Sequence, residues 1–130
     1  MSDELRVLYA DDEPDIREVA SIALELDGGI ELRSVGSGVE ALSALERSDW
    51  RPHVVLLDVM MPGMDGPAVL AEMRMRPALA DLPVIFITAR AQTQEQQRFI
   101  GLGAIGVITK PFDPMTLARE LRAIAARARP

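Results

Sequence analysis

The stretch HVVLLDVMMPGMDGP, at residues 53–67, determines the fold class expected for this chain. Residues 54–57 form an unbroken apolar run, which is typical of a strand buried on both faces of a parallel sheet. The run stops at Asp58, and the PG and DG dipeptides that follow favour turns. Ligands of open α/β sheets bind outside the carboxyl ends of the strands, so Asp58 is a candidate functional residue. Alternatively, Asp58 only caps the next helix, but Asp65 is better placed for that role.

The composition narrows the class of protein. A chain of 130 residues that is 48% apolar predicts a single globular domain over residues 1–130. The net charge of -6 argues against direct nucleic-acid binding and against an anionic membrane as the main partner. With no cysteine and one histidine, disulfides, thiolate chemistry and histidine-based metal sites or triads are not expected. A signal-peptide pattern and an apolar run of about 18 residues are both missing from the sequence, which predicts a cytoplasmic protein.

Strand-like and helix-like patterns alternate along the chain. Strands are expected at Leu5–Ala10, Ile30–Val35, 54–57, 84–87 and 105–109. Helices are expected from Pro14 to the Gly28-Gly29 pair, after Ser37-Gly38, from Gly66 to Pro77, over Thr93–Leu102, and in the last segment, where Asp113 is a candidate N-cap. The predicted apolar faces are Ile16, Val19, Ala20, Ala23 and Leu26 in the first helix, Val39, Leu42 and Leu45 in the second, Val69, Leu70 and Met73 in the third, and Met115, Leu117, Leu121 and Ile124 in the last.

This alternation of strand and helix predicts the fold class. Strict strand-helix repetition implies right-handed crossovers and a parallel sheet with helices on both faces. A closed barrel of eight such units needs about 250 residues, many more than this chain has. We therefore expect an open, doubly wound α/β sheet.

Polar side chains follow four of the predicted strands. Asp11 and Asp12 come after the first strand, Asp58 after the third, Thr88 after the fourth and Lys110 after the fifth. The carboxyl ends of parallel strands share one edge of a sheet, so these side chains should converge although they are far apart in sequence. Each of them alone also has an ordinary structural explanation, but their joint placement favours a site.

This set of side chains favours phosphoryl chemistry. Crowded carboxylates repel one another, and a divalent cation relieves that repulsion. Hard oxygen ligands suit Mg²⁺, which typically binds one or two carboxylates together with phosphate oxygens. A carboxylate beside the metal can attack phosphorus and form an aspartyl phosphate. Lys110 can then neutralise the phosphoryl oxygens, and the Thr88 hydroxyl can donate a hydrogen bond to one of them.

Four motifs together resemble one known family. YADDEP at 9–14, LLDVMMPGMDG at 56–66, ITA at 87–89 and KPF at 110–112 are similar, in order and spacing, to the receiver domain of two-component response regulators. The resemblance covers essentially the whole chain. It implies a flavodoxin-like fold, with a doubly wound five-stranded parallel sheet in the order 2-1-3-4-5 and five helices.

The resemblance also implies a role for each strand-end residue. These are the phosphoacceptor Asp58, the Mg²⁺ ligands Asp11, Asp12, Asp58 and the backbone carbonyl of Met60, and the switch and phosphate-sensing residues Thr88 and Lys110. The peptide bond between Lys110 and Pro111 is expected to be cis, which only a proline allows at low cost. One position departs from the family: many receivers carry an aromatic residue three positions before the lysine, and this chain has Val107.

The resulting expectation is a phosphorelay receiver. A histidine kinase or a histidine phosphotransfer protein would phosphorylate Asp58, and a downstream protein would read the surface formed by the fourth helix, fifth strand and fifth helix. Such a domain assists its own phosphorylation and dephosphorylation and is not expected to turn over an external substrate. The alternatives are a receiver-like interaction module that is never phosphorylated, the receiver part of a larger regulator or hybrid kinase, and a metal-dependent phosphatase with an aspartyl nucleophile.

Overall fold

The structure is a computed structural model that describes residues 4–47 and 49–128. In this part of the chain strands and helices alternate, as the sequence predicts. The strands are β1 (Leu5–Ala10), β2 (Ile30–Val35), β3 (Val54–Asp58), β4 (Val84–Thr88) and β5 (Gly106–Thr109). The helices are α1 (Pro14–Glu25), α2 (Gly38–Glu46), α3 (Gly66–Arg74), α4 (Thr93–Leu102) and α5 (Leu117–Ala126).

The strands form one parallel sheet in the order β2-β1-β3-β4-β5, so the predicted doubly wound fold is confirmed. Its central strand is β3, which is buried along its whole length, as is β4 beside it. By contrast, β2 lies at an edge and exposes several of its residues. The unbroken apolar run at the centre of the sequence therefore marks the strand that has helices on both sides.

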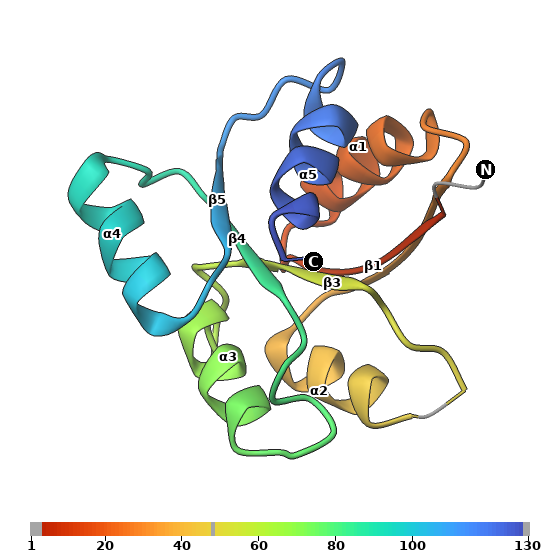
Figure 1. The fold of residues 1–130 in the computed structure, drawn as a ribbon. Helices are drawn as coiled ribbons and strands as arrows, with labels where there is room; N and C mark the ends of the chain where they lie inside the picture. Colours follow the sequence, from red (N-terminus) through yellow and green to blue (C-terminus); the bar gives the residue numbers. More distant parts are fainter. Residues whose placement is uncertain (1–3, 48, 129–130) are drawn as a thin grey trace.

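The helices cover the two faces of the sheet (Figure 1). Helices α1 and α5 lie side by side on one face, and α2, α3 and α4 lie on the other. A hydrophobic core fills each of the two interfaces. Alternate residues of a strand point to opposite faces, so β3 and β4 contribute to both cores and need apolar side chains at consecutive positions.

The apolar faces of two helices differ from the prediction. Val19 of α1 and Leu26, just after the helix, are exposed, and the buried residues of α1 are Ala20, Ala23 and Leu24. In α2, Val39 is exposed, and the core takes up Gly38, Ala41, Leu42 and Leu45. In both helices at least one alanine is buried while the valine is exposed, because a small side chain lets the helix backbone approach the sheet closely. The apolar face predicted for α3 is confirmed.

The predicted start of the last helix is wrong. The carboxylate of Asp113 accepts a hydrogen bond from the backbone N–H of Met115 at 2.8 Å, and its carbonyl accepts one from Thr116 at 3.0 Å. These bonds form a turn before the helix, which begins only at Leu117. Met115 therefore lies outside α5 and is 82% exposed.

The predicted cap at Asp65 is confirmed, and Ser37 caps a second helix. Asp65 accepts a hydrogen bond from the N–H of Ala68 at 2.9 Å at the start of α3, and Ser37 accepts one from the N–H of Glu40 at 3.1 Å at the start of α2. Both bonds satisfy backbone donors that have no partner within the first turn of a helix.

None of the helices in residues 4–47 and 49–128 has the length and apolar character needed to cross a lipid bilayer.

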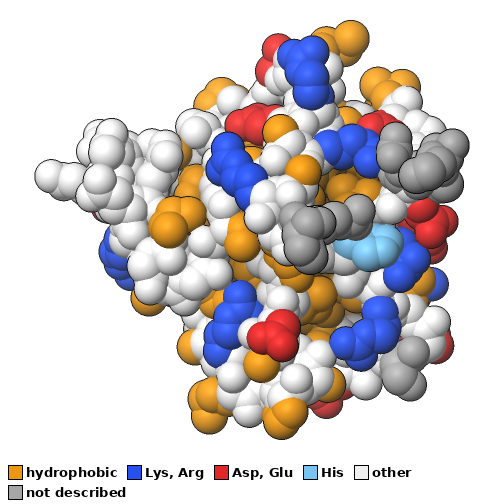
Figure 2. Space-filling view, viewed as in Figure 1, with side chains coloured by type: hydrophobic (Ala, Val, Ile, Leu, Met, Phe, Trp, Pro, Cys, Tyr) orange, Lys and Arg blue, Asp and Glu red, His pale blue; other side chains and the backbone are white. Residues whose placement is uncertain are grey.

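On the face of the molecule seen in Figure 2, basic side chains are interspersed with acidic and hydrophobic ones.

Candidate functional site

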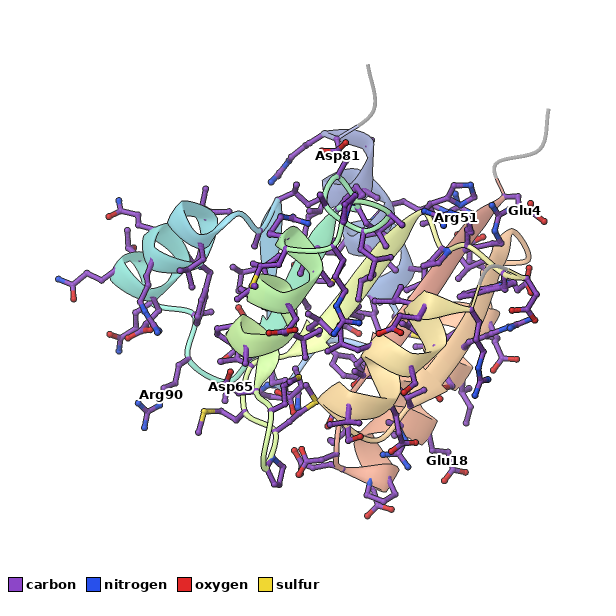
Figure 3. All side chains as sticks on the ribbon, turned by 90° about the horizontal axis from the view of Figure 1, so that it is seen from below. Glu4, Glu18, Arg51, Asp65, Asp81 and Arg90 are labelled. Atoms are coloured by element: carbon purple, nitrogen blue, oxygen red, sulfur yellow. The ribbon has the colours of Figure 1, made fainter. Side chains whose placement is uncertain are left out.

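The carboxyl ends of the strands lie together at one edge of the sheet. Figure 3 shows Asp65 and Arg90, which follow β3 and β4, at its lower edge. Glu4, Arg51 and Asp81, which precede β1, β3 and β4, lie at the opposite edge. The loops that leave the strands are therefore separated from the loops that enter them by the length of the sheet.

Three carboxylates meet at this edge. Asp11, Asp12 and Asp58 each offer an oxygen, and these atoms lie within 4.8 Å of one another. Asp11 and Asp58 are buried, with 0% and 3% exposure, and Asp12 is partly exposed. The predicted convergence is confirmed for these residues. Their hard oxygen atoms, crowded together and partly open to solvent, fit a divalent metal ion.

Lys110 joins the carboxylates from the end of β5. Its Nζ lies 2.9 Å from Oδ2 of Asp11, 3.4 Å from Oδ2 of Asp58 and 3.6 Å from Oε1 of Glu13. Its side chain is only 13% exposed, so water screens these ion pairs weakly. The peptide bond that follows Lys110 is cis, as the resemblance implied.

Asp11 is held by residues that the sequence did not single out. The Tyr9 hydroxyl donates to Oδ2 of Asp11 at 2.6 Å, and the backbone N–H of Glu13 donates to Oδ1 at 3.0 Å. A guanidinium N–H of Arg17 donates to the backbone carbonyl of Asp11 at 2.6 Å. Residues two apart on a strand share a face, and a buried tyrosine hydroxyl needs a partner, so the spacing of Tyr9 and Asp11 was a usable signal.

The pKa values of Asp58 and Asp11 are shifted in opposite directions by these surroundings. Burial, together with the negative charge of Asp11, raises the pKa of Asp58 to about 6, although Lys110 partly offsets the effect. Burial also acts to raise the pKa of Asp11, but hydrogen bonds from Tyr9 and Lys110 outweigh it and hold that pKa below its usual range. Asp58 is thus the carboxylate that is less well stabilised in its charged form.

Lys110 remains firmly protonated in the same cluster. Burial alone would lower the pKa of Lys110, but its hydrogen bond to Asp11 and the charge of Asp58 outweigh burial and raise the pKa. The site therefore combines a fixed positive charge with a buried carboxylate that is costly to ionise.

The two remaining predicted positions lie beside Asp58. Thr88 is in the strand next to β3, where Asp58 pairs with Ile87. Its hydroxyl accepts a hydrogen bond from the backbone N–H of Arg90 at 3.0 Å. The N–H of Met60 donates to Oδ1 of Asp58 at 3.3 Å, while the Met60 side chain is exposed. The metal-binding role of the Met60 carbonyl stays a prediction.

The loop after Asp58 approaches β3 closely at Gly66. A Cβ atom at this position would lie 2.7 Å from the backbone carbonyl oxygen of Asp58 and 3.2 Å from the Phe86 ring. Only glycine fits there without displacing the backbone that carries the Asp58 carboxylate. The sequence marked Gly66 as a turn residue and the start of a helix, but not as a close backbone contact.

Val107 occupies the position where many receivers have an aromatic residue. It pairs with Phe86 across β4 and β5 and packs, partly buried, against the core between the sheet and α2, α3 and α4. Phe86 in turn meets Phe99 of α4 edge to face, with ring centroids 5.1 Å apart. In this chain the aromatic contact between the sheet and α4 is therefore made by Phe86 of β4, and not by a residue of β5.

Comparison with known proteins agrees with this geometry. A sequence model of the family described as the response regulator receiver domain matches residues 7–122. The transcriptional regulatory protein CseB of Streptomyces coelicolor is 38% identical over 129 residues, which cover 98% of this chain and 52% of that protein. The phosphate regulon transcriptional regulatory protein PhoB of Escherichia coli is 33% identical over 127 residues, which cover 96% of this chain and 53% of that protein. This chain spans about half the length of these curated relatives.

A solved structure supports the same assignment. The chemotaxis response regulator CheY4 of Vibrio cholerae superposes with a TM-score of 0.83 at 31% sequence identity, covering 93% of this chain and 98% of that one. The sequence match and the structural match each cover most of the chain, and the acidic cluster lies within the matched residues 7–122. The chain therefore belongs to the response regulator receiver domain family.

Proposed function

We propose that Asp58 accepts a phosphoryl group from a histidine kinase or a histidine phosphotransfer protein in a Mg²⁺-dependent reaction. The observation that supports this most directly is the meeting of Asp58 with Asp11, Asp12 and Lys110 at the carboxyl edge of the sheet. The family of the chain makes a two-component partner the natural donor.

The chemistry at Asp58 needs an ionised carboxylate in a site that compensates negative charge. With a pKa of about 6, Asp58 is ionised at neutral pH but poorly stabilised in that form. One of its oxygens attacks phosphorus, so that an O–P bond forms while the P–N bond to the donor histidine breaks. The electron pair of that bond remains on the imidazole, which takes up a proton.

The surrounding residues have separate tasks in this step. Asp11, Asp12 and Asp58, with the carbonyl of Met60, would hold Mg²⁺, which supplies positive charge to the phosphoryl oxygens when bound. Lys110 already lies 3.4 Å from Oδ2 of Asp58 and can donate to a phosphoryl oxygen as the group arrives. We assign the Thr88 hydroxyl the same donor role toward another phosphoryl oxygen.

The signal is the charge of the phosphoryl group, about -1.5 to -2 by analogy with other phosphorylated side chains. We propose that it biases a pre-existing equilibrium in the loop after Thr88, and that a downstream protein reads the surface of α4, β5 and α5. The domain would assist its own phosphorylation and hydrolysis without turning over an external substrate. Because the curated relatives are about twice as long, the same receiver also fits as part of a larger regulator or hybrid kinase.

The decisive experiment is intact mass measurement after incubation with acetyl phosphate and Mg²⁺. We expect one phosphoryl adduct on the wild-type protein, none on Asp58→Asn and none in EDTA. Asp65→Asn is the matched control, because Asp65 follows the same strand but serves only as a helix cap. An adduct that survives in Asp58→Asn would exclude the proposed acceptor.

The second candidate function is an interaction module that is never phosphorylated, and Val107 is the observation that motivates it. Complete absence of an adduct on the wild-type protein would favour this candidate. Turnover of an added phosphate ester, measured in a separate phosphatase assay, would instead favour the phosphatase alternative.

A further inference from the structure

Tyr9 is buried in β1 next to the proposed metal ligands. Its side chain has 0% exposure and otherwise belongs to the core between the sheet and helices α1 and α5. Its hydroxyl reaches out of this apolar core to Oδ2 of Asp11 at 2.6 Å. A hydrogen bond from a buried hydroxyl to a charged carboxylate is among the stronger kinds, since water does not compete for either group.

The contacts of Asp11 assign different tasks to its two oxygens. Oδ2 accepts a hydrogen bond from the Tyr9 hydroxyl and forms an ion pair with Nζ of Lys110 at 2.9 Å. Oδ1 accepts one bond, from the N–H of Glu13 at 3.0 Å. A carboxylate oxygen has about two acceptor positions, so Oδ2 is fully used and the remaining position is on Oδ1.

We propose that Tyr9 is a positioning residue for metal binding, which anchors Oδ2 of Asp11 and so turns Oδ1 toward the divalent cation. This inference rests on the proposed function, because it concerns the same metal site. The simpler role for Tyr9 is to fill the core, with Asp11 merely satisfying its hydroxyl. The two roles differ in what happens when only the hydroxyl oxygen is removed.

Removal of the hydroxyl leaves only the Lys110 ion pair on Oδ2 and the Glu13 N–H bond on Oδ1. With one fewer partner, the carboxylate can rotate more freely about its Cβ–Cγ bond. Metal binding must then restrict that rotation. Residues that hydrogen-bond to a metal ligand, without binding the metal themselves, typically contribute about 10-fold to 100-fold to metal affinity. We expect an effect of this size here.

The test is Mg²⁺ binding to the unphosphorylated protein, measured by isothermal titration calorimetry for wild type and Tyr9→Phe. We expect the dissociation constant to rise by about 10-fold or more in the variant. Ile85→Val is the matched control, because Ile85 is equally buried in the same core. That control should unfold at a lower denaturant concentration and bind Mg²⁺ as wild type does.

A second measurement follows the carboxylate without metal. In metal-free protein, the amide proton resonance of Glu13 reports its hydrogen bond to Oδ1 of Asp11. We expect Tyr9→Phe to shift this resonance upfield and to speed its exchange with solvent, whereas Ile85→Val leaves both unchanged. If Tyr9→Phe does not fold, the Tyr9 hydroxyl proton of the wild type is observed instead, and it should shift when Mg²⁺ is added.

The outcomes separate the inference from the proposed function. Wild-type protein that binds no Mg²⁺ contradicts the metal site itself. Wild type and Tyr9→Phe that bind Mg²⁺ equally, with an unchanged Glu13 amide, overturn the role of Tyr9 and leave the proposed function standing. A wild-type hydroxyl resonance that does not respond to Mg²⁺ also overturns it.

Discussion

Replacing Asp58 with asparagine should stabilise the metal-free protein, although it removes the proposed phosphoacceptor. The carboxyl group of Asp58 is buried and lies close to the charge of Asp11, and these two influences raise its pKa from 3.8 to about 6. Folding therefore places an ionised group where the charged form is unfavourable. Asparagine keeps the shape of the side chain and removes the charge.

The size of the effect follows from the pKa. The difference between 3.8 and about 6 corresponds to about 3 kcal/mol when the group is fully ionised in both the folded and unfolded states. This difference already includes the attraction between Asp58 and Lys110, and we take it as an upper value because asparagine still buries a polar amide in place of the carboxyl group. The expected gain at pH 8 is roughly 1 to 3 kcal/mol.

Urea denaturation in EDTA at pH 8 measures this gain. The midpoint of Asp58→Asn should lie on the order of 1 M urea above that of wild type. Asp65→Asn is the control for the loss of one formal charge, since asparagine caps a helix about as well as aspartate. Its midpoint should stay close to that of wild type.

The pH dependence of the stability difference between Asp58→Asn and wild type gives an independent check. The folded-state pKa of Asp58 is raised, so the penalty is fully present above about pH 6 and fades as the pH falls through the folded value toward 3.8. The advantage of the variant should shrink to about half at pH 5. A variant that unfolds at the same or lower urea concentration than wild type at pH 8, or an advantage that grows on acidification, would refute the reasoning.

Three other predictions concern metal binding, an ion pair and a close backbone contact. Mg²⁺ at about 100 times its dissociation constant should stabilise the wild-type protein by about 2.7 kcal/mol, and Asp12→Ala should lose most of this response in thermal unfolding at low salt. Arg122 donates to both oxygens of Asp27, at 2.6 and 2.9 Å, and with the N–H of a nearby glycine holds the pKa of Asp27 below its usual range. Because folding lowers that pKa, the ion pair stabilises the folded protein at pH values above the unfolded-state pKa, and this stabilisation is lost as the pH falls through the folded-state pKa. Asp27→Asn should therefore lower the free energy of unfolding by about 1 kcal/mol at pH 7, and the urea midpoint of the variant should depend less on pH in the acid range. Gly66→Ala should destabilise the protein by roughly 1 to 3 kcal/mol in urea because its Cβ would overlap a backbone carbonyl, whereas Gly101→Ala in α4, where a Cβ meets nothing within 4 Å, should be neutral or stabilising. Equal effects of these two glycine substitutions would contradict the steric argument.

Much of the fold could be predicted because its main signal is local. A strand with helices on both sides must be apolar at consecutive positions, and β3 and β4 show this pattern without interruption. The helix caps at Asp65 and Ser37 are equally local, because a cap bonds to an N–H only a few residues ahead. The convergence of Asp11, Asp58 and Lys110 then followed from a general property of parallel sheets.

The errors occur where several local patterns compete. In and just after α1, the sequence places apolar residues on overlapping faces, and Ala20, Ala23 and Leu24 are buried while Val19 and Leu26 are not. The helix face that packs on the sheet is set by how closely the helix backbone can approach the strands. This distance depends on the side chains of both the helix and the sheet, and not on the helix sequence alone. Likewise, Asp113 has the right type for an N-cap but bonds within a preceding turn.

The sequence by itself determined the order of strands and helices, the parallel sheet and the residues that stand at its carboxyl edge, because periodicity and strand ends are written along the chain. Only the tertiary structure decided how those residues interact. The hydrogen bond from Tyr9 to Asp11, the pairing of Lys110 with two carboxylates and the raised pKa of Asp58 all depend on distance and burial. Burial removes water that would otherwise weaken each interaction, and burial arises only when distant segments pack together.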